Sequence, residues 1–190
     1  VDRWLTTGIL TSATPHAETI LRAMLGQIDV QDVAMTDDKR QLIAGLIDTA
    51  IATKTDIGPL VSGALTISSD VDETEIDTKL TLATSVARSA AKIGPQSTSG
   101  DTLRDLLRPL YHRSLAIIAD PNQPPSRRCH AIEMLGRGIA GDAAAESAEK
   151  TLLASLLVPS VPPDVQTKAV ESLARIDHGV LVDVALSKWE

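Results

Sequence analysis

The chain has 190 residues, of which 43% are apolar and 23% charged, and its net charge is −7 at neutral pH. This apolar fraction excludes a disordered chain, and the acidic balance argues against nucleic-acid binding, which needs a basic surface to displace counterions. Alanine and leucine lead the composition with 24 and 23 copies, whereas aromatic residues make up only 2%. Because alanine and leucine favour helices and strands favour aromatic and β-branched residues, the composition predicts an all-α protein.

Apolar residues recur at helical spacing along almost the whole chain, which predicts ten helices with short connections. The first follows Asp2, and another runs from Leu103 to Ile118, where Pro109 should kink or split it because proline has no amide proton. The remaining predicted helices span about 15–26, 37–54, 57–67, 73–93, 125–137, 144–157, 162–176 and 179–189. The segment 94–100, rich in glycine, serine and threonine, is the clearest predicted loop.

Two absences narrow the possible classes of protein further. Cys129 is the single cysteine, so no disulfide can form within the chain, and stability must come from packing. No apolar run approaches the ~20 residues that a membrane-spanning helix needs, so no membrane span is expected in this segment.

An internal repeat appears in the last third of the chain. Residues 128–137 align with residues 166–175 at a constant offset of 38. The matched pairs are Ala131 with Ala169, Glu133 with Glu171, Leu135 with Leu173 and Arg137 with Arg175. A small residue at the alanine position lets a neighbouring helix approach closely, and the leucine one turn later fills the groove. Weaker anchors upstream are Ala83, Ala44 and Thr7, at spacings of 48, 39 and 37 residues. These spacings scatter around the ~40–47 residues of two-helix HEAT repeats.

This pattern resembles the HEAT-like α-solenoid family. The resemblance implies a right-handed α-α superhelix of the HEAT or armadillo type, with about five antiparallel helix pairs. It covers residues 1–190 as a single domain.

Three short segments carry a narrower resemblance: 2–13, which contains Asp-Arg-Trp-Leu, then 163–170, and the closing Leu-Ser-Lys-Trp at 186–189. Together they look like the helical-repeat region of large bacterial multidomain proteins of the membrane-bound dehydrogenase type. In that family a β-propeller lies before the repeats and a c-type cytochrome domain after them. The resemblance implies an exported protein whose redox chemistry lies outside this segment. Because no Cys-x-x-Cys-His occurs here, haem attachment is not carried over. The missing initial methionine adds to the expectation that the segment is excised from a longer protein.

No pattern of catalytic or metal-ligating residues stands out. Cys129 and His130 are adjacent on a predicted helix, so their side chains do not face each other as a catalytic pair must. The four histidines are scattered, whereas zinc needs three or four converging ligands. The acidic run from Asp70 to Asp77 suggests a calcium loop, but it lacks the EF-hand glycine and final glutamate, so helix capping is the favoured interpretation. We therefore expect no catalytic residue, cofactor or metal site.

Five arginines form the strongest candidate binding feature: Arg104, Arg108, Arg113, Arg127 and Arg128. Successive helices of a solenoid share one binding face, so a row of arginines there could recognise acidic groups of a partner. The alternative is ordinary solvated charge. Trp4 and Trp189 could anchor a partner, but each also lies on an apolar helical stripe and could serve packing alone.

These features predict a non-catalytic helical-repeat scaffold, which binds a protein partner or spaces the domains of a larger redox-type protein. The alternative is an all-α enzyme or ligand-binding domain with a pocket between helices. The terminal helices are apolar on more than one face, so flanking domains, or weak self-association, should cover them.

Overall fold

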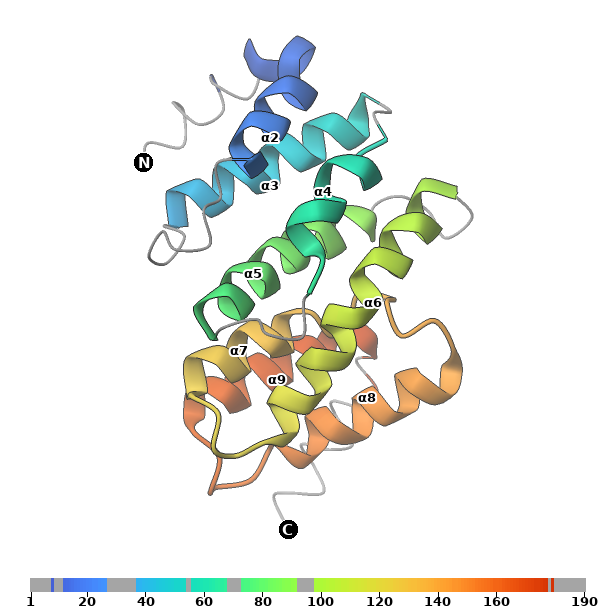
Figure 1. Ribbon diagram of the computed structural model, residues 1–190. Coiled ribbons are helices and arrows are strands. Elements are labelled where there is room, and N and C mark those ends of the chain that lie inside the picture. The colour runs from blue at the N-terminus through green and yellow to red at the C-terminus, as the bar shows by residue number, and fades with distance from the viewer. Residues whose placement is uncertain are drawn as a thin grey trace. The chain divides into compact units, whose positions relative to one another are not determined.

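Every regular element of the described chain is helical. The computed structural model describes residues 8, 12–26, 37–53, 56–67, 73–91, 98–177 and 179. Its elements (Figure 1) are η1 (Thr14–His16), α2 (Ala17–Gly26), α3 (Asp37–Ala52), α4 (Gly58–Leu65), α5 (Glu73–Ala90), α6 (Thr98–Ala119), α7 (Pro125–Glu133), α8 (Ala143–Ser155) and α9 (Pro163–Ile176). No strand occurs in these ranges, which confirms the predicted all-α class. Most residues of the helices predicted after Asp2 and over 179–189, with Trp4 and Trp189, lie outside the described ranges.

The chain divides into two compact units, Val1–Leu110 and Tyr111–Glu190. In the first unit, four helices contact one another in a closed set. The consecutive helices α2 and α3 are in contact, and so are α4 and α5. Contacts also join α2 to α4 and α3 to α5, so that two helix pairs lie against each other.

The apolar stripes read from the sequence form the core of this unit. The five α5 residues predicted to share a face are all at most 5% exposed: Ile76, Leu80, Ala83, Ala87 and Ala90. On α3, which contacts α5, the fully buried residues include Ile43, Leu46 and Ile47. A polar contact also joins α3 to α5: the Ser89 hydroxyl donates a hydrogen bond to Asp48 Oδ1 at 2.5 Å.

Helix α6 begins earlier than predicted, and Pro109 does not split it. It begins at Thr98, inside the segment predicted as a loop, and it continues through Pro109 to Ala119 without being split. Proline removes the hydrogen bond to the carbonyl of Asp105, one turn earlier. Both Asp105 and Pro109 are exposed, so water can hydrate that carbonyl and the helix tolerates the loss.

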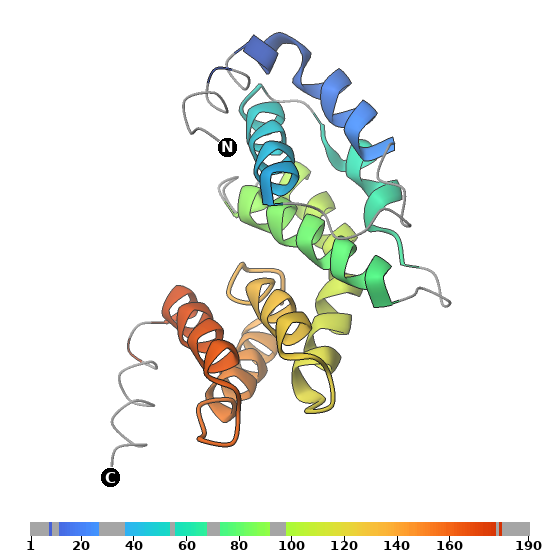
Figure 2. The same cartoon turned by 90° about the vertical axis from the view of Figure 1, so that its left-hand side faces the viewer.

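In the second unit, α7 and α9 pack side by side, and α8 also contacts α9 (Figures 1 and 2). The repeat predicted from the sequence lies at the α7–α9 contact. Ala131 and Ala169 are fully buried, as are Leu135 and Leu173. The predicted packing of the two alanine-bearing helices against each other is therefore observed.

The two repeat helices end differently. Helix α9 reaches Ile176 as predicted, whereas α7 ends at Glu133, short of the predicted Arg137. The chain then makes a turn in which Gly136 and Gly138 have φ of 73° and 70°. This is the left-handed region that glycine adopts without steric cost, so these glycines end α7 early.

Candidate functional site

The five arginines singled out in the sequence occupy different environments. Arg104 and Arg108 lie on α6, and each binds an aspartate one turn earlier, Asp101 and Asp105, the second pair at 2.9 Å. Arg113 is exposed. Arg127 and Arg128 are only 8% and 5% exposed, so they do not belong to a solvated row of cations.

The two buried arginines make local structural contacts. Arg128 Nη2 donates to the carbonyl of Ile118 at 3.1 Å, and Arg127 Nη1 donates to Gln123 Oε1 at 3.2 Å. Ile118 lies in the last turn of α6, where carbonyls have no partner within the helix. Arg128 therefore caps the end of α6, and partner binding by the five arginines stays a prediction.

The other residues weighed in the sequence do not converge. Cys129 is partly buried, and this burial raises the pKa of its thiol, which opposes formation of the nucleophilic thiolate. Within the described ranges, no group of three or more His, Cys, Asp and Glu residues could hold a metal ion. Helix α5 begins at Glu73 in the acidic run, while Asp70 and Asp72 lie outside the described residues, as does His178. None of the described helices has both the length and the apolar character needed to cross a bilayer.

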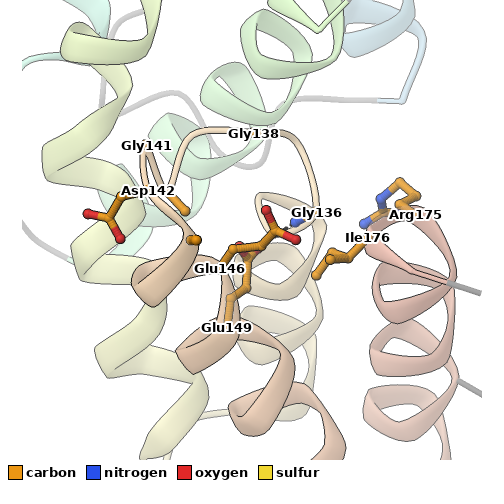
Figure 3. A pocket seen from close by; sticks show the side chains of 10 residues that line it. Gly136, Gly138, Gly141, Asp142, Glu146, Glu149, Arg175 and Ile176 are labelled. Carbon is orange, nitrogen blue, oxygen red and sulfur yellow. Dashed lines mark hydrogen bonds between the residues drawn. The ribbon is translucent and has the colours of Figure 1, made fainter. Parts of the chain in front are cut away.

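A pocket that the sequence analysis missed lies in the second unit. It has a volume of about 440 Å³ and is formed by the turn 136–143, by Glu146 and Glu149 of α8, and by Arg175 and Ile176 at the end of α9. We call it the α8–α9 pocket. Figure 3 shows the Glu146 and Glu149 side chains extending from α8 toward Gly136, with the Asp142 carboxylate turned to the other side.

Glu149 connects α8 to the turn that follows α7. This side chain is only 3% exposed, and its Oε1 accepts a hydrogen bond from the Gly136 amide at 2.5 Å. Burial is the largest cause of a raised pKa for this carboxyl, and repulsion from Glu146 adds to it. The Gly136 hydrogen bond and the nearby Arg175 act in the opposite direction.

A second set of bonds connects α9 to the end of α7. Ser172 Oγ donates to the carbonyl of Ile132 at 2.9 Å, and Arg175 Nη2 donates to the carbonyl of Leu135 at 3.2 Å. Arg175 Nη2 also lies 2.5 Å from Ser172 Oγ. Arg175, the arginine that lines the pocket, is thus held in place by its bonds to Leu135 and Ser172.

The close approach of the two helices depends on Gly136. A Cβ atom at this position would lie 2.9 Å from the carbonyl oxygen of Ser172 and 3.1 Å from the Ile176 side chain. Gly138 also has a positive φ, but a Cβ there would have no neighbour within 4 Å. Position 136 therefore requires glycine for two reasons: its φ is positive, and a Cβ atom there would overlap the Ser172 carbonyl oxygen.

The charges of Glu149 and Asp142 also act on Tyr111. It is buried, and its hydroxyl has no hydrogen-bond partner among the described residues. Burial raises its pKa to about 12, and the charges of Glu149 and Asp142 contribute to the shift.

The sequence does contain a signal for this pocket. Three glycines occur between positions 136 and 141, and Asp142, Glu146 and Glu149 follow at spacings of four and three. Such spacing places acidic side chains on one face of a helix that begins beside a glycine-rich turn. The sequence analysis used the glycines only as markers of helix ends.

Comparison with known protein families, with characterised proteins and with solved structures finds no match for this chain.

Proposed function

We propose that this segment is a non-catalytic helical-repeat scaffold, which binds a protein partner or spaces the domains of a larger protein. In this proposal the helix pairs continue as a right-handed HEAT-like superhelix. The sequence resemblance described above extends the proposal to a parent protein with redox domains on either side.

The packing of α7 against α9 carries this proposal. In a solenoid, equivalent helices of successive repeats stack side by side, each burying its apolar face on the next. Ala131 and Ala169 are buried in this way, and Ser172 and Arg175 bind main-chain carbonyls of the preceding repeat. The contacts of α2 with α4 and of α3 with α5 follow the same pattern in the first unit.

The experiment is site-specific photo-crosslinking in cells that produce the native protein. A photoreactive residue replaces either Ser126 of α7 or Val170 of α9, both exposed and both in the layer of equivalent helices. Thr151, exposed on α8, is the control from the other layer. Because a solenoid binds along one continuous face, we expect positions 126 and 170 to capture the same protein, or the same flanking segment, and position 151 not to.

The opposite result would contradict the scaffold proposal. If neither position 126 nor position 170 gives a product above background, or if their products share no partner, the α7–α9 layer is not a binding face.

The α8–α9 pocket favours a second candidate function, the binding of a small ligand between helices. Its volume of about 440 Å³ is within the range of about 300–1,000 Å³ usual for ligand pockets. A buried glutamate and an arginine at its wall would supply the polar contacts that orient a ligand.

A further inference from the structure

We propose that Pro109 is a hinge in α6, about which the two compact units rotate while the packing inside each unit is kept. The proposal goes beyond the scaffold proposal and does not rest on it, because it concerns a motion of the chain itself. It follows from the position of one proline in a helix that belongs to both units.

The boundary between the two units lies inside α6, next to Pro109. The first unit ends at Leu110 and the second begins at Tyr111, whereas α6 runs without a break from Thr98 to Ala119. The backbone crosses the boundary once, through this helix. A rotation of one unit on the other that keeps α6 continuous must therefore bend the helix near Pro109.

The turn that ends at Pro109 is the weakest part of α6. Its nitrogen carries no proton for the carbonyl of Asp105, and its ring crowds that carbonyl, so one hydrogen bond of the helix is missing. Sharp bends in helices occur at such prolines. The ion pairs of Arg104 with Asp101 and of Arg108 with Asp105 both lie before Pro109, so neither stabilises the helix across it.

The missing bond lies on the side of α6 that water reaches. Asp105 and Pro109 are exposed, whereas Leu107 and Leu110 are fully buried. Helices bend most readily with their convex side toward solvent, because carbonyls on that side tilt outward to water. A bend that opens the exposed side hydrates the Asp105 carbonyl and leaves the two leucines packed.

Each half of α6 is held in a different unit. Before the boundary Leu103 is 1% exposed, and Thr102 Cγ2 lies 3.4 Å from where a Cβ atom would stand on Gly58, at the start of α4. After the boundary Ile118 is fully buried, and its carbonyl accepts the hydrogen bond from Arg128 of α7. Bending is therefore confined to the segment between these contacts, which contains the proline.

The test measures distances between nitroxide spin labels by pulsed electron paramagnetic resonance. In a Cys129→Ala background, Gln41→Cys on α3 and Thr151→Cys on α8 carry one label in each unit, both at exposed positions. A second pair, Ser126→Cys with Thr151→Cys, lies within the second unit and gives the width that the labels themselves produce. We expect a broad distance distribution for the first pair and a narrow one for the second, because hinge rotation changes only the first.

The variant Pro109→Ala removes the hinge. Alanine supplies the missing amide proton at an exposed position, so the helix becomes regular without loss of packing. The distribution between positions 41 and 151 should then narrow by about half. Pro163→Ala is the matched control, because it makes the same change at the exposed first position of α9, where an amide has no partner within the helix. It should leave the distribution unchanged.

Three results would overturn the hinge. The first is a native distribution between positions 41 and 151 as narrow as that of the pair within the second unit. The second is equal width in the native chain and in Pro109→Ala, and the third is a lower melting temperature of that variant, which would show that the turn is not weak. None of these results would contradict the scaffold proposal, because the crosslinking experiment tests α7 and α9 within the second unit.

Discussion

The hydroxyl of Ser172 donates a hydrogen bond to the main-chain carbonyl of Ile132, 40 residues earlier, at 2.9 Å. Ser172 is fully buried, and its oxygen also lies 2.5 Å from Arg175 Nη2. A single side chain on α9 thus connects the end of α7 to the arginine at the pocket. The first two predictions concern this junction.

Replacing Ser172 by alanine should lower the free energy of unfolding by about 1–2 kcal/mol. The change removes the bonds to Ile132 and Arg175, but the Ile132 carbonyl still accepts the Leu135 amide at 3.0 Å, which limits the loss. Ser155→Ala, at an exposed position on α8, should change stability by less than about 0.5 kcal/mol. Urea unfolding of both variants provides the measurement, and equal effects at the two positions would contradict a role for the Ser172 bonds.

Replacing Gly136 by alanine should destabilise the chain more than replacing Gly138. Both variants place alanine at a positive φ, which costs about 1–2 kcal/mol. Only Gly136→Ala adds a Cβ 2.9 Å from the Ser172 carbonyl oxygen, and relieving this overlap should cost a further 1–3 kcal/mol or so. Thermal unfolding of the pair separates the two effects, and identical melting temperatures would show that the α7–α9 approach is looser than described.

The Glu149→Gln variant should be more stable than the native chain at neutral pH. Glutamine keeps an acceptor for the Gly136 amide but removes the buried charge. Because the folded-state pKa of Glu149 is raised, its contribution to stability is fully present below its ordinary value of 4.5 and is lost as pH rises through the folded-state value. The advantage of the variant should therefore grow as pH rises from 4 to 7.

Denaturant unfolding at several pH values tests this prediction, with Glu171→Gln as the exposed control. A Glu149→Gln variant that is less stable at neutral pH would mean that attraction from Arg175 outweighs the cost of burial.

Tyr111 is the only tyrosine of the chain, so its titration can be followed by ultraviolet absorbance without other phenols. In the folded protein it should ionise near pH 12 and in the unfolded chain near the ordinary pKa of 10.0. Because the folded-state pKa is raised, the contribution of this group to stability is present below pH 10 and is lost as pH rises through 12. A folded chain that shows tyrosinate absorbance with a midpoint at pH 10 would contradict the burial of this hydroxyl.

Local patterns in the sequence predicted the helices well because helical periodicity involves residues only three or four positions apart. Ile76, Leu80 and Ala83 of α5 were assigned to one buried face, and all three are buried. The pairing of Ala131 with Ala169 also came from the sequence, since two copies of one pattern bury the same face. Of the two outcomes expected at Pro109, a kink or a split, the split does not occur, because the cost of proline depends on whether water reaches the carbonyl one turn earlier.

The sequence by itself determined the all-α class, the buried stripes and the two C-terminal repeat helices. Only the tertiary structure decided that Arg128 caps α6, and that Glu149 is buried against Gly136. The physical reason is the length scale of the interactions. Apolar spacing is a property of a single helix. The cost of a buried charge depends instead on its partners on other elements, which lie 10 residues away for Arg128 and 13 residues away for Glu149. The bond between Ser172 and Ile132 spans 40 residues and forms only once α7 and α9 are packed together.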